Sequence, residues 1–167
     1  MFPRREAVNS RREEKGSIRK VILRLHRTGD MQAHSRYYHA TLIEPTNHTL
    51  IVTFQEWLPK VSQRLKRQGI KHNPFPDMDS TKYGGYVIQN DGITIMVLYP
   101  DNDNEVVVHE TSHAVGFAWE EAGASEEIEL SGEVLAYCMG KTAAFVFDAF
   151  DKLCKTYVEE NQHEEKE

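Results

Sequence analysis

Cysteine is scarce in this chain of 167 residues, which contains only Cys138 and Cys154. Both lie within apolar helical patterns, and neither belongs to a Cys-x-x-Cys motif of the kind that binds metals or performs redox chemistry. This usage argues against a disulfide-dense secreted scaffold and against a zinc site built from cysteines. We expect reduced thiols in the core of a cytoplasmic protein.

Long apolar runs are also missing, since no segment approaches the ~20 residues that a membrane-spanning helix needs. The first six residues, Met-Phe-Pro-Arg-Arg-Glu, lack the apolar core of a secretory signal. Hydrophobic residues make up 40% of the chain and charged residues 28%, a composition typical of globular proteins. The sequence therefore predicts a cytoplasmic protein with no membrane partner.

Charge is divided unevenly along the chain. Residues 1–72 carry fifteen Lys or Arg and six acids, whereas residues 73–167 carry five Lys or Arg and twenty acids. Such asymmetry can mark a nucleic-acid-binding half, or it can mark two solvated faces that attract each other within the fold. Because no nucleic-acid-binding motif is recognisable, nucleic acid is the less favoured partner.

The ends of the chain are strongly charged and poorly hydrophobic. We expect a disordered arm over residues 1–16, a single domain over residues 17–158 and a charged tail over residues 159–167.

The most informative stretch, residues 106–118, reads VVVHETSHAVGFA and contains the pattern H-E-x-x-H. On a helix, residues four apart lie on the same face, so His109 and His113 can direct two imidazole nitrogens at one zinc ion. Glu110 then lies beside the open coordination position and can take a proton from a zinc-bound water. The alternative is an amphipathic core helix with two ordinary histidines. It is less favoured because burying His, Glu and His together is costly without a metal.

A third ligand is expected from another element, because a catalytic zinc usually has three protein ligands. The candidate is Glu133, which follows His113 after nineteen residues. Glu126 and Glu129 share its helical face and could replace it. Glu133 is preferred because Val134 and Leu135 follow it directly, whereas the other two belong to an acidic run.

This combination of His109-Glu110-Thr-Ser-His113 with Glu133 resembles the zincin metallopeptidases of the gluzincin type, and among them small zincin-like peptidases often carried by bacteriophages. The resemblance covers about residues 84–140. It implies Zn²⁺ bound by both histidines and Glu133, hydrolysis of a peptide bond in a peptide or protein substrate, and an edge strand that holds the substrate beside the motif helix. For a phage protein, the location would be the host cell cytoplasm.

One position departs from the family pattern. Gluzincins of the thermolysin type carry an acid four residues after the glutamate ligand, where this sequence has Tyr137. Tyr137 could donate a hydrogen bond to the developing oxyanion, or it could be an ordinary half-buried tyrosine. The residues leave these two alternatives open.

The remaining patterns predict an α+β fold: a small, mainly antiparallel sheet, the motif helix and a second long C-terminal helix. The expected elements are a weakly favoured strand within residues 18–26, a hairpin of residues 37–43 and 49–54, a short basic helix from Leu58, a hairpin turning at Asn90-Asp-Gly92, and helices ending near Gly123 and Tyr157.

A second class of function remains open. Under this alternative, we expect a catalytically weak, zinc-stabilised binding module that contacts a host protein or nucleic acid through its basic N-terminal half.

Overall fold

The computed structural model describes residues 32–44, 46, 48–70, 84–90, 92–122 and 132–164. The arm expected over residues 1–16, the strand expected within residues 18–26, the helix-ending Gly123 and the acids of residues 126–129 lie outside these ranges.

The described strands form one five-stranded sheet with the order β1-β2-β3-β5-β4. Three of its four strand pairings are antiparallel, and β3 and β5 run parallel, so the sheet is mixed. The strands are β1 (Gln32–His34), β2 (Tyr38–Ile43), β3 (His48–Phe54), β4 (Tyr86–Asn90) and β5 (Ile93–Leu98). Both predicted hairpins are present.

In the described part of the chain, three α-helices accompany the sheet, which confirms the α+β class. They are α2 (Leu58–Arg67), preceded by the 3-10 turn η1 (Gln55–Trp57), then α3 (Asn104–Glu121) and α5 (Gly132–Glu164). The second C-terminal helix is long, as predicted, but the expected end near Tyr157 was wrong. The helix continues to Glu164, into the segment expected to be a tail.

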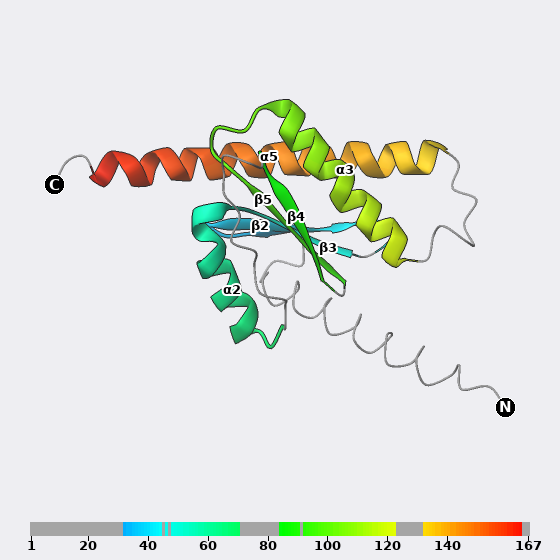
Figure 1. Ribbon diagram of the computed structural model, residues 1–167, viewed down its shortest axis with the longest axis horizontal. Helices are drawn as coiled ribbons and strands as arrows, with labels where there is room; N and C mark the ends of the chain where they lie inside the picture. The colour runs from blue at the N-terminus through cyan, green and yellow to red at the C-terminus, as the bar shows by residue number, and fades with distance from the viewer. Residues whose placement is uncertain are drawn as a thin grey trace.

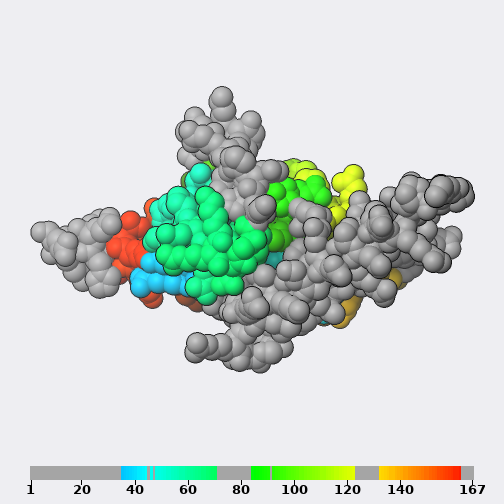
Figure 2. Space-filling view, turned by 90° about the horizontal axis from the view of Figure 1, so that it is seen from below, coloured from blue at the N-terminus to red at the C-terminus, as the bar shows by residue number. Residues whose placement is uncertain are grey.

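Helices cover the sheet on both faces (Figure 1). Along β3, Leu50, Val52 and Phe54 pack with residues of α3 and α5, whereas Ile51 packs with residues of α2. Alternate residues of a strand point to opposite faces, so every residue of β3 and β5 is buried. Figure 2 shows α2 at the surface on its side of the sheet.

Both cysteines are free: Cys138 is buried and Cys154 half-buried. Burial raises the pKa of both thiols, which makes the reactive thiolate scarce at neutral pH. None of the helices in the described part of the chain is sufficiently long and apolar to traverse a bilayer.

The motif helix α3 begins with a side-chain cap. Asp103 adopts an extended backbone, and its Oδ1 accepts a hydrogen bond from the backbone N–H of Val106 at 2.9 Å. The carboxylate also lies at the positive end of the helix dipole.

We therefore expect Asp103→Ala to lower the free energy of unfolding by about 1 kcal/mol, because a first-turn N–H loses its acceptor. Asp101 is exposed and lies two residues earlier. The matched Asp101→Ala control should change stability by less than about 0.5 kcal/mol. Urea unfolding followed by circular dichroism measures both, and equal effects of the two variants would contradict the cap.

Candidate metal centre

Two histidines meet on the exposed side of α3. The Nε2 atoms of His109 and His113 lie 3.1 Å apart, and their rings are inclined at 80° with centroids 4.7 Å apart. Two nitrogens bound at about 2.05 Å to one tetrahedral zinc lie roughly 3.3 Å apart. The pair therefore has a separation that a shared zinc ion accepts with little rearrangement.

The expected burial of these histidines was wrong. Both are exposed, whereas the apolar side of α3 that packs on the sheet carries Val107, Ala114, Val115 and Ala118. The valines and alanines around the motif suggested an enclosed helix, but only one side of the helix meets the core. The two imidazoles are consequently accessible to an ion from solvent.

Glu110 differs from its histidine neighbours because it is only 6% exposed. Burial raises the pKa of the Glu110 carboxyl, and the neighbouring His109 and His113 lower it to a smaller extent. Desolvation disfavours the carboxylate, so this group holds a proton more readily than an exposed glutamate does. That property suits a group that must accept and release a proton near neutral pH.

The two glycines just before β4 lie directly against α3. A Cβ atom added to Gly85 would lie 3.1 Å from Cγ of Glu110, and one added to Gly84 would lie 3.0 Å from a methyl group of Val106. Two successive residues without side chains thus allow the strand to approach the motif helix closely. Glu110 is enclosed between α3 and the strands β4 and β5.

The proposed third ligand is not brought to this site. Glu133 lies in the first turn of α5, where residues 132–137 are all exposed. Within the ranges that the structure describes, no three His, Cys, Asp or Glu side chains are grouped closely enough to hold a metal ion. The structure thus brings the imidazoles of His109 and His113 together, keeps Glu110 close enough to be influenced by their charge, and does not group Glu133 with them.

Tyr137 is placed one turn beyond Glu133 and is 66% exposed. The ammonium group of Lys141 lies over its ring, 5.5 Å from the centroid. This exposure contradicts the alternative of an ordinary half-buried tyrosine. It leaves the phenol accessible, at a position that the structure does not connect with the histidines.

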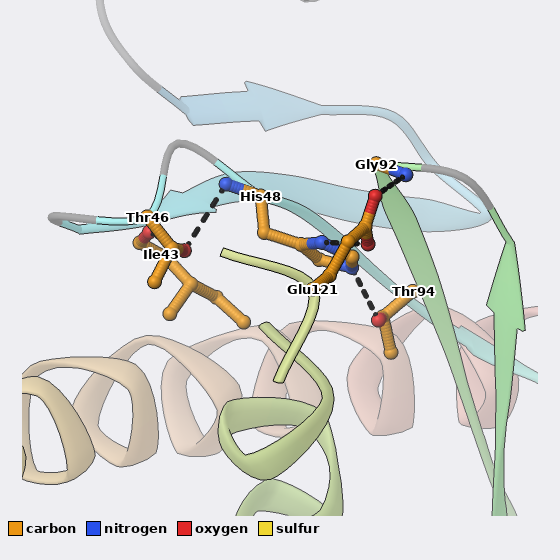
Figure 3. A network of polar contacts seen from close by, with 6 residues as sticks. All are labelled: Ile43, Thr46, His48, Gly92, Thr94 and Glu121. Carbon is orange, nitrogen blue, oxygen red and sulfur yellow. Dashed lines mark hydrogen bonds and ion pairs between the residues drawn. The ribbon is translucent and has the colours of Figure 1, made fainter. Parts of the chain in front are cut away.

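Sequence reasoning missed a second polar cluster, at the far end of α3 (Figure 3). His48 Nδ1 lies 2.8 Å from Oε2 of Glu121, and its Nε2 lies 2.6 Å from Oγ1 of Thr94. The order acid, imidazole, hydroxyl is that of a nucleophilic triad. However, Thr94 is 0% exposed, so a substrate carbonyl has no access to its hydroxyl. The only sequence signal was polar residues within apolar strands.

The chain was compared with protein-family models, curated proteins and solved structures, and none of the three comparisons found a match.

Gly85 generates a prediction about the site. A methyl group there would lie 3.1–3.2 Å from Glu110, Leu98 and the carbonyl oxygen of Val97. We expect Gly85→Ala to destabilise the fold by about 1–3 kcal/mol, because strand and helix must separate.

The matched control is Gly116→Ala on the exposed side of the same helix, where an added Cβ meets nothing within 4 Å. In that variant the free energy of unfolding should rise by about 0.5–1 kcal/mol, since alanine is the better helix former. Thermal unfolding compares the two, and a stabilising Gly85→Ala would contradict the close approach.

Proposed function

We propose that this protein is a zinc-dependent metallopeptidase that hydrolyses a peptide bond without a covalent intermediate. The observation that carries the proposal is the pair of Nε2 atoms 3.1 Å apart on His109 and His113, with the buried Glu110 between them on α3. Two imidazoles at zinc-binding separation beside a carboxyl of raised pKa are the central parts of a hydrolytic zinc site.

The donor set fits zinc better than a hard cation. Neutral imidazoles suit Zn²⁺, whereas Mg²⁺ and Ca²⁺ prefer sites composed of oxygen ligands. Zinc bound there would lower the pKa of a coordinated water and polarise the carbonyl to be cleaved. The exposed position of the two histidines leaves room for water and substrate beside them.

Glu133 is the third ligand that we propose, with Glu129 as the alternative. In this structure Glu133 lies outside reach of the histidines, so coordination requires the first turns of α5 to lie closer to α3. Residues 132–137 are all exposed, and a shift of these turns therefore disrupts little buried surface. Coordination would supply the free energy that the shift costs.

Glu110 is the general base of the proposed reaction. Its enclosed carboxyl would accept a proton from the attacking water and pass it to the leaving amine. The phenol of Tyr137 is the proposed helper, which would donate a hydrogen bond to the developing oxyanion. This role also requires the first turns of α5 to approach α3.

The edge strand β4 offers a place for the substrate. Among the described strands β4 pairs with β5 alone, and it lies beside α3 (Figure 1). An extended peptide that adds to such an edge gains backbone hydrogen bonds without demands on its sequence. The contact of Gly85 with Glu110 places this edge next to the proposed base.

The proposal is tested by Glu110→Gln. We expect turnover of a peptide mixture to fall about 10²–10⁴-fold while bound zinc and the fold are retained, because the variant loses the base but no ligand. Glu105, an exposed residue of the first turn of α3, provides the control: Glu105→Gln should keep full activity. Turnover unchanged in Glu110→Gln at equal zinc content would exclude the mechanism.

One observation favours the binding-module alternative. Lys60, Arg64, Lys66 and Arg67 of α2 are all exposed, on the side of the sheet opposite α3. A wild-type protein that holds zinc but cleaves neither peptides nor peptidoglycan cross-links would favour this alternative, particularly if it bound nucleic acid with a steep salt dependence.

A further inference from the structure

The buried cluster around His48 ties together elements that are far apart in the sequence (Figure 3). Glu121 is the last residue of α3, His48 is the first residue of β3, and Gly92 lies in the turn between β4 and β5. Oε1 of Glu121 accepts the backbone N–H of Gly92 at 2.6 Å, while Oε2 lies 2.8 Å from Nδ1 of His48. One carboxylate therefore bridges the hairpin turn and the neighbouring strand.

The side chain of His48 is only 3% exposed, and this burial makes it a rigid partner. A carboxylate offers only acceptors, so the close contact of Nδ1 with Oε2 at 2.8 Å favours the proton of His48 on Nδ1. The 2.6 Å contact of Nε2 with Thr94 fixes the plane of the ring. Hydrogen bonds to an ionised acceptor are the strong ones, especially away from water.

The turn at Gly92 is held from two sides. Its carbonyl oxygen accepts the N–H of Thr49 of β3 at 2.9 Å, and its N–H is bound by Glu121. Gly92 adopts a φ of 72°, a conformation that glycine tolerates without strain. The turn is thus fixed to both the central strand and the end of the motif helix.

The opposite end of β4 has its own tie. Asn102, just before α3, accepts the N–H of Tyr99 at 2.8 Å and donates from Nδ2 to the carbonyl oxygen of Gly84. The strand β4 is thereby connected to the start of α3 through Asn102 and to the end of α3 through Glu121. Both connections use polar side chains rather than apolar packing.

We infer that Glu121, oriented by His48, is a positioning residue that sets the distance between the β4 edge and the motif helix. It acts on the binding of an extended peptide rather than on bond cleavage, since His109 and His113 lie two to three turns earlier on α3. The consequence for peptide binding rests on the proposed function, whereas the hold on the hairpin does not.

The variant that isolates this role is Glu121→Gln. Gln loses the negative charge, so it can keep only a neutral hydrogen bond to Gly92, and its amide can bind His48 as well only if the imidazole changes tautomer. Glu120, the preceding residue, is exposed, and Glu120→Gln removes the same charge from the same turn of helix. The pair of variants thus separates the bridge from the general effect of charge.

The first measurement is amide hydrogen exchange of the 167-residue chain by nuclear magnetic resonance. We expect the Gly92 amide to exchange at least about tenfold faster in Glu121→Gln, as follows from the loss of a charge-assisted hydrogen bond. Wild-type protection should persist in Glu120→Gln. An unchanged exchange rate of the Gly92 amide in Glu121→Gln would contradict the role of Glu121 in holding the hairpin turn. Complete unfolding of this variant would contradict a role confined to the turn.

The second measurement is peptide hydrolysis by the zinc-loaded protein. Glu121→Gln should raise KM about tenfold and leave kcat and zinc content within about twofold of the wild type, because only the peptide-binding edge is loosened. A fall in kcat at constant KM would overturn the positioning role. If the wild type hydrolyses no peptide, the proposed function fails, and the exchange result alone decides whether Glu121 holds the hairpin.

Discussion

The close approach of the strand β4 to the helix α3 is the constraint on which the candidate site depends. It exists because the two residues before β4, Gly84 and Gly85, have no side chains. A Cβ atom on Gly84 would lie 3.0 Å from Val106, and one on Gly85 would lie 3.1 Å from Glu110, closer than such atoms normally pack. This contact encloses the carboxyl of Glu110, and enclosure raises its pKa. An edge strand and a proton-accepting group thus become neighbours through a single packing feature.

The motif divides its three polar residues between two environments. His109 and His113 face solvent, where an ion and its water can enter, whereas Glu110 is buried against the sheet. The difference follows from helix geometry, since successive residues are about 100° apart around the axis. One short pattern therefore combines accessible imidazoles with an enclosed carboxyl, and the proposed hydrolytic function rests on this arrangement.

Local chemistry in the sequence predicted much of the fold. Asn90-Asp-Gly92 predicted the second hairpin, because a tight turn depends on neighbouring residues. The parallel pairing of β3 with β5 could not be predicted, since it joins strands about forty residues apart. The same holds for the bridge from Glu121 to His48, which no spacing rule describes.

In the candidate site, too, local features could be predicted from the sequence and tertiary ones could not. Residues four apart on one helix brought His109 and His113 together as predicted, but their exposure depends on which side of α3 meets the sheet. The position of Glu133 depends on the path that the chain follows between α3 and α5. The sequence gives the number of residues in that connection but not its path, so the position of Glu133 could not be predicted.

Metal content tests the central claim most directly. Zinc would be added in excess, removed by dialysis and measured in three proteins: the wild type, a variant with alanine at both 109 and 113, and Ser112→Ala as a control on the same exposed side of α3. We expect about one zinc per chain in the wild type and in Ser112→Ala, and none in the double variant, because each imidazole supplies a coordinate bond. Zinc retained by the folded double variant would contradict it.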